Sequence, residues 1–197
     1  MRHLLPLLFC VPTTFAAAPP VPHLKQVQAA MAAQVERELE GKGTASQVAM
    51  ALFAPRLNAL PWCLPAAEGA VDCSVGYERG MDQHHRMMRL SPRGDGWHLE
   101  STRLPVPVPD VTELAPQLQV RLAEALAGAT DDESRAALRK EADGMRLSSV
   151  HDCDLDQASG QLQCTLALVF DRGRTGRMTL GLQRVSNQWR LDPLPID

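Results

Sequence analysis

The chain is poor in aromatic residues and has no long apolar run. Aromatic side chains make up 4% of its 197 residues, so aliphatic side chains and methionine must form most of any core. The apolar run from Leu4 to Phe15 is shorter than the roughly 20 residues that cross a bilayer, and nothing later is longer. The sequence therefore predicts no transmembrane segment.

An excess of positive charge is also missing. The chain has 20 lysines and arginines against 23 aspartates and glutamates, a formal net charge of −3. Nucleic-acid and anionic-lipid binding need clustered cations, so neither is predicted. Hydrophobic residues make up 45% of the chain, enough for a buried core and too many for a disordered protein.

Catalytic motifs are absent from the sequence. It contains neither a nucleophile elbow of the Gly-x-Ser-x-Gly type nor a zinc-binding His-Glu-x-x-His. His98 and His151 have no spacing that requires an acidic partner. We expect a non-enzymatic protein without a cofactor.

The start of the chain is typical of an exported protein. A positive segment, residues 1–3, precedes the apolar run, and the small residues 16–18 follow it. This order predicts a signal peptide at residues 1–17 and export to the periplasm or the exterior. Bulky Phe9 directly before Cys10 argues against lipid attachment at that cysteine.

Four cysteines remain after removal of the signal peptide. An even number in an exported chain predicts two disulfides, and spacing alone leaves three pairings open. The two halves of the chain repeat one pattern, at an offset of 90 to 92 residues, from the cysteines to Trp97 and Trp189. This series predicts a duplication, in which equivalent cysteines pair equivalently. The predicted disulfides are Cys63–Cys73 and Cys153–Cys164.

Each copy is predicted to begin with two helices. Apolar residues at helical spacing run from Leu24 to Leu39 and, in the second copy, from Leu114 to Leu126. Capping boxes that begin at Thr44 and Thr130 open the second helices. The helix opened at Thr44 is expected to run toward Leu60.

Strand-forming segments follow the helices. They cover residues 73–79, 84–90 and 97–103, then 164–170, 177–184 and 187–191, with a leading strand at the first cysteine of each copy. The predicted fold is α+β, a tandem duplication of an α-α-β-β-β-β unit, with antiparallel sheets each covered on one face by helices. The units span residues 18–104 and 111–197, and the Pro-rich residues 105–110 favour a stiff, extended linker.

Two patterns bear on metal binding. Residues 81–88 are rich in histidine and methionine, but side chains alternate along a strand. Only His85 and Met87 are therefore expected together on the solvent-facing side of the first sheet. Two ligands are too few to predict a copper site, and we expect core methionines beside a solvated histidine pair. The alternating aspartates of residues 152–156 lack the glycine and glutamate of a calcium loop.

A basic loop lies between two predicted strands. Arg172, Arg174 and Arg177 are spaced by glycines, and guanidinium groups suit carboxylates and phosphates. Phosphate-loop spacing is absent. The ordinary interpretation is a solvated turn, and the functional one is contact with an acidic protein partner.

We therefore expect an exported protein-binding module, most specifically an inhibitor or immunity-type protein that blocks an exported enzyme. A small-ligand or lipid carrier of the cell envelope and a periplasmic metal-handling protein are the alternatives. The order of elements and the placement of the cysteines resemble the β-lactamase inhibitory proteins across most of the mature chain. The resemblance implies a rigid binding surface built from two sheets, and no residue role follows from it because no motif is shared.

Overall fold

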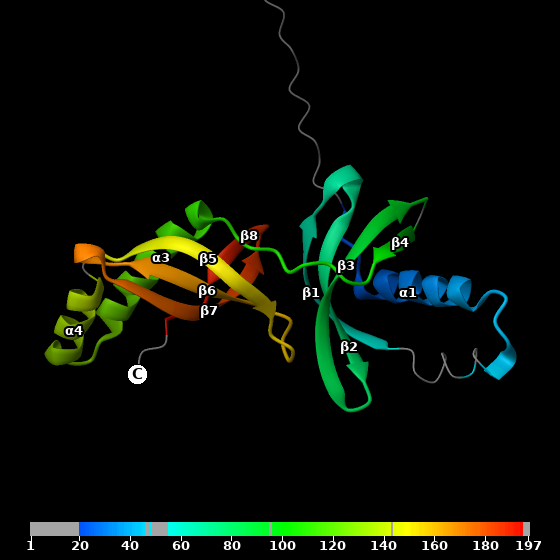
Figure 1. The fold of residues 1–197 in the computed structure, drawn as a ribbon, viewed down its shortest axis with the longest axis horizontal. Helices are drawn as coiled ribbons and strands as arrows, with labels where there is room; N and C mark the ends of the chain where they lie inside the picture. Colours follow the sequence, from blue (N-terminus) through cyan, green and yellow to red (C-terminus); the bar gives the residue numbers. More distant parts are fainter. Residues whose placement is uncertain (1–19, 46–47, 49–54, 95, 143, 195–197) are drawn as a thin grey trace, which may run out of the picture.

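The computed structural model describes residues 20–45, 48, 55–94, 96–142 and 144–194 (Figure 1). They form three α-helices and two four-stranded antiparallel sheets, which confirms the α+β class. None of the helices in this part of the chain is long and apolar enough to cross a membrane. The predicted signal peptide, residues 1–17, lies outside the described residues.

The first sheet has strand order β1-β2-β3-β4, so each strand pairs with the next one along the chain. Helix α1 contacts both edge strands, and its Val27 and Ala30 share a core with Val75, Met88 and Leu99 of the sheet. The core of this unit therefore lies between α1 and one sheet face. The elements are α1 (Leu24–Leu39), β1 (Arg56–Pro65), β2 (Val71–Arg79), β3 (Asp82–Arg93) and β4 (Gly96–Ser101).

The second sheet has the same order, β5-β6-β7-β8. Leu114, Leu118 and Leu122 of α3 are buried in a core shared with Leu166 and Leu182 of the sheet. Helix α4 contacts α3, and none of its described side chains is buried, so the expectation that both helices cover the sheet is wrong for α4. The elements are α3 (Val111–Gly128), α4 (Asp132–Ala142), β5 (Arg146–Leu155), β6 (Leu162–Val169), β7 (Thr175–Val185) and β8 (Gln188–Leu191).

The helix predicted from Thr44 toward Leu60 is wrong at its end. Strand β1 begins at Arg56, while residues 46–47 and 49–54 of the predicted helix lie outside the described residues. Pro55 lies inside the predicted helix, where proline removes a backbone donor and clashes with the preceding turn, and β1 begins directly after it. Pro61 and Pro65 are tolerated in β1 because it is the edge strand of its sheet.

The start of α4 also differs slightly from the prediction. Asp131, rather than Thr130, precedes the helix as its cap, and its Oδ1 accepts the Ser134 backbone N–H at 2.7 Å. This hydrogen bond satisfies a donor that the first helical turn leaves free. It is also the main reason that the pKa of Asp131 is lowered.

Both predicted disulfides are confirmed. Cys63 of β1 bonds to Cys73 of β2, its direct partner in the strand register. Cys153 lies in an irregular part of β5 and bonds to Cys164 of β6. Each bond links the first two strands of its sheet, and Cys73 and Cys164 are completely buried.

Side chains of α3 close the free edge of β8. The Trp189 N–H donates to Glu113 Oε1 at 2.6 Å, and the Leu191 N–H donates to Gln117 Oε1 at 3.1 Å. Gln117 Nε2 donates to the Trp189 carbonyl, and Arg121 donates to the Leu191 carbonyl. The three helix positions are four residues apart and so lie on one helix face. Together they replace a neighbouring strand at an edge that would otherwise be open to pairing.

Candidate functional site

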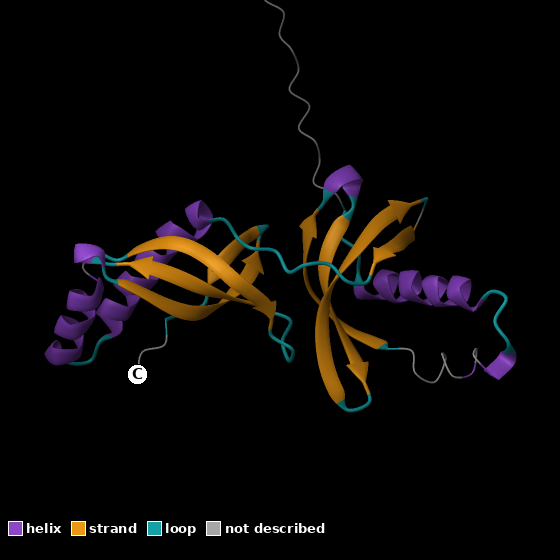
Figure 2. Cartoon of the chain, in the orientation of Figure 1, coloured by secondary structure: helices purple, strands orange, loops and turns teal. Residues whose placement is uncertain are grey.

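The turn between β5 and β6 reaches the first sheet, and Figure 2 shows this loop directed toward β2 and β3. The Gly160 carbonyl accepts the Trp62 Nε1–H at 3.0 Å and the Ser74 hydroxyl at 3.1 Å. Trp62 also meets Trp189 edge to face, with ring centroids 5.0 Å apart. We call this contact between the two units the seam, defined by Trp62, Ser74 and His85 of the first sheet with residues 155–162 and Trp189 of the second unit.

His85 and Met87 lie at the seam, and the expectation that this histidine is solvated is wrong. His85 and Met87 are 6% and 2% exposed, on the sheet face opposite Met88. The His85 backbone N–H donates to Gln157 Oε1 at 3.1 Å, and its Nδ1 lies 3.1 Å from the Gln157 carbonyl. The second unit thus covers the sheet face that carries the two candidate metal ligands, His85 and Met87. Among the described residues, no three histidine, cysteine or acidic side chains gather as metal ligands.

Gly160 allows the turn to approach this closely. Its φ is +69°, and a Cβ at this position would lie 2.4 Å from His85 Cδ2 and 2.8 Å from Pro61 Cγ. Real side chains do not tolerate such distances, and L-residues disfavour this backbone conformation. The seam therefore depends on a glycine whose carbonyl is the central acceptor.

The basic loop lies at the far end of the second sheet. Arg172, Arg174 and Arg177 are all exposed, and the Arg174 guanidinium lies 5.2 Å from the centre of the Phe170 ring. Arg172 has a φ of +63° in a short 3-10 turn, η2 (Asp171–Gly173), between β6 and β7. The structure describes no ion pair for these three arginines, which leaves their charge available to a partner.

The second sheet has an open face on the side away from α3. Leu166 and Leu180 point into the core, so their neighbours along β6 and β7 point outward. The strand register aligns these outward residues as Ser149–Ala167–Arg177 and His151–Thr165–Thr179. We call this surface the open face; its side chains are small or polar, and Arg177 and Thr179 are exposed.

The two histidines considered for catalysis are not built into a buried acid–base pair. His151 Nδ1 lies 2.7 Å from Asp152 Oδ2, but the Asp152 side chain is 77% exposed. His98 Nδ1 lies 3.4 Å from Arg37, and partial burial, with Arg93 and Arg37 nearby, lowers its pKa.

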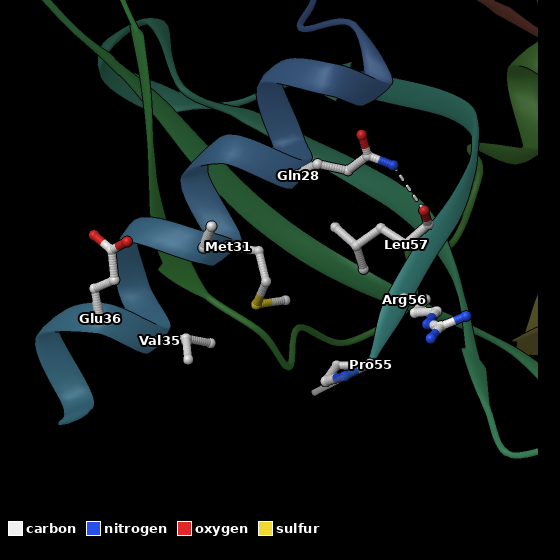
Figure 3. A pocket seen from close by; sticks show the side chains of 8 residues that line it. Gln28, Met31, Val35, Glu36, Pro55, Arg56 and Leu57 are labelled. Atoms are coloured by element: carbon white, nitrogen blue, oxygen red, sulfur yellow. Dashed lines mark hydrogen bonds between the residues drawn. The ribbon is translucent and has the colours of Figure 1, made fainter. Parts of the chain in front are cut away.

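A hollow of about 610 Å³ lies between α1 and the start of β1 (Figure 3). Met31, Val35 and Leu57 give it an apolar wall, and Gln28 crosses it by donating to the Leu57 carbonyl at 2.9 Å. Sequence patterns did not single out these residues, because they read as ordinary core positions of a helix and a strand.

Comparisons with known proteins add no assignment. None of them supports the expected resemblance to the β-lactamase inhibitory proteins, which stays a prediction. No protein-family model matches the chain, and no curated protein or solved structure gives a significant match.

Proposed function

We propose that this chain is a non-catalytic protein-binding module, an inhibitor or immunity-type protein that acts on an exported enzyme. The binding surface is the open face of β5–β8 together with the arginines at its end. The observation that carries the proposal is that the contact between the units covers the outer face of the first sheet and leaves that of the second exposed. The turn at residues 155–162 packs on the outer face of the first sheet, whereas Thr179 and Arg177 of the second stay exposed.

Rigidity supports the proposal. Each sheet carries one disulfide, and hydrogen bonds from Trp62, Ser74 and His85 join the units at the seam. A surface that is already ordered loses little conformational entropy on binding, so more of the contact energy becomes affinity. Arginine is frequent at binding hot spots and pairs well with carboxylates. The partner is therefore expected to present an acidic surface.

We also propose that the chain is exported and that its two units arose by duplication. The predicted signal peptide at residues 1–17 and the two disulfides support an oxidising compartment. The equal strand orders and the equal place of each disulfide support descent of both units from one α2β4 ancestor. Trp97 in β4 and Trp189 in β8 are equivalent positions in that scheme.

The test begins with capture of a partner by the oxidised mature protein from the envelope fraction of its host. Binding and enzyme inhibition are then measured with the purified partner. Arg172→Ala/Arg174→Ala should weaken binding at least tenfold. The matched control is Arg56→Ala/Arg79→Ala, which removes two exposed arginines of the first unit. Equal loss in both variants, or binding without inhibition of any enzyme, would contradict the proposed function.

A carrier of small apolar ligands is the second candidate, and the hollow between α1 and β1 favours it. Met31, Val35 and Leu57 would contact the ligand. It ranks second because Gln28, Glu36 and Arg56 place polar and charged side chains among the described residues that line the hollow. Native mass spectrometry of the purified protein decides between the candidates: a bound lipid that Val35→Trp displaces would establish the carrier.

A further inference from the structure

A second hollow lies at the seam, between the free edge of β1 and the β7–β8 turn. Its volume is about 310 Å³, and we call it the seam cleft. Trp62 and Leu64 form an apolar wall on one side, and Arg184 and Asn187 lie on the other. A neighbouring hollow of about 390 Å³ continues along β1 and shares Trp62 and Cys63 with it.

Arg184 is the only charged residue among the described residues that line the cleft. Its side chain is 13% exposed, and its guanidinium lies 5.0 Å from the centre of the Trp189 ring. Burial lowers the pKa of Arg184, and Glu113 only partly counteracts this effect. A cation placed so deeply needs compensation from a negative charge.

The compensation that the chain itself supplies is incomplete. Nη1 of Arg184 lies 3.8 Å from Glu113 Oε1, too far for a hydrogen bond. That same oxygen already accepts the Trp189 N–H at 2.6 Å. Nη2 donates to Asn187 Oδ1 at 3.0 Å, and Nε is buried without a partner in the described structure. Nε is too deeply buried to reach a ligand, so the donor capacity left for one is that of Nη1.

We propose that the seam cleft binds a carboxylate carried by an apolar or aromatic group. The carboxylate pairs with Arg184, whose planar guanidinium matches it in shape and charge. The apolar group lies against Trp62 and Leu64. The volume is at the small end of ligand pockets, and ligand sites commonly lie where two structural units meet. This site lies apart from the open face and does not depend on the proposed function.

Two sources can present this chemistry, a free organic acid or the C-terminal residue of a polypeptide. The neighbouring hollow along β1 offers room for the preceding residues of a chain. The probes are therefore N-acetyl-L-phenylalanine, its amide, the tripeptide Ala-Ala-Phe and the amide of that tripeptide. Binding is followed by calorimetry and by tryptophan fluorescence, since Trp62 lines the cleft and Trp189 contacts Arg184.

We expect the acids to bind at least tenfold more tightly than the amides, and Arg184→Gln to abolish this preference. The control is Arg190→Gln, which removes an exposed arginine from the adjacent strand. Leu64→Trp, which fills the cleft and keeps Arg184, should also prevent binding, so the test survives if Arg184→Gln fails to fold. Tighter binding of the tripeptide than of the free acid assigns a chain terminus, and equal binding assigns a small acid. Equal binding of acids and amides, retention in either cleft variant, or no binding at millimolar concentration overturns the proposal.

Discussion

Replacement of Gly160 by alanine tests whether the seam holds the two units together. The new Cβ would lie 2.4 Å from the His85 ring and 2.8 Å from Pro61, so the turn must move away. Its carbonyl would then lose the hydrogen bonds from Trp62 and Ser74. Both donors are buried side chains of the first sheet.

The expected loss of unfolding free energy has two contributions, the positive φ and the lost hydrogen bonds. An alanine substitution at a second glycine measures the first contribution separately. The positive φ of +69° costs an L-residue about 1–2 kcal/mol whatever surrounds it. Gly173→Ala is the matched control, because its φ is +73° and its Cβ would meet nothing within 4 Å. Each buried donor left without an acceptor adds about 1–3 kcal/mol. Because two buried donors lose their acceptor, Gly160→Ala should lower the free energy of unfolding by about 2–6 kcal/mol more than Gly173→Ala does.

Urea denaturation followed by tryptophan fluorescence and by circular dichroism measures this difference. Trp62 takes part in the seam, so its emission should change before the secondary structure unfolds. Separate transitions of the two probes in Gly160→Ala would show that the units uncouple before they unfold. A difference of less than about 0.5 kcal/mol between the two alanine variants, with coincident transitions, would refute the role given to the seam, because each lost hydrogen bond alone should exceed it.

Three further predictions concern stability. Cys164→Ser removes the disulfide between residues 11 apart and should lower the free energy of unfolding by about 2.5–3 kcal/mol, measured by urea denaturation under oxidising conditions. An unchanged midpoint would contradict the disulfide. Gln117→Leu removes two hydrogen bonds from the β8 edge and should cost about 1–3 kcal/mol, measured in the same assay. Backbone hydrogen bonds from Thr112 and Ser134 are the main cause of the lowered pKa values of Asp110 and Asp131. The resulting stability is present above their unfolded pKa of about 4 and is lost as the pH falls through the folded values. Asp110→Asn/Asp131→Asn should therefore flatten the loss of stability between about pH 4 and pH 2; an unchanged slope would refute this assignment.

Most strands other than β1 could be predicted because their signals are local. The strand predicted at residues 177–184 is part of β7, and its Leu180 and Leu182 are buried. The region around β1 was harder, since its apolar spacing also fits a helix. There Pro55 interrupts the helical pattern, and β1 can hold Pro61 and Pro65 because it is an edge strand, which is a property of the whole sheet.

The candidate sites were harder to predict from local patterns than the strands were. Arg172 and Arg174 were visible in the sequence because a loop of arginines and glycines is a local pattern. Arg184 was not, because no local pattern shows that its side chain is largely buried and lines a cleft together with Trp62, which is far away in the chain. His85 was placed on the correct face by strand alternation, yet its burial comes from Gln157, 72 residues later.

The sequence by itself determined the α+β class, the helix α1, the leucine stripe of α3 and the two disulfides. These follow from side-chain periodicity and from matching two halves of one chain, which need no knowledge of distant contacts. Only the tertiary structure decided which sheet face is covered and which is left open. That choice depends on a single glycine turn, where Gly160 lets the backbone reach Trp62 and Ser74. Close approach between the units depends on their three-dimensional shapes, which the periodicity of side chains along the sequence does not predict.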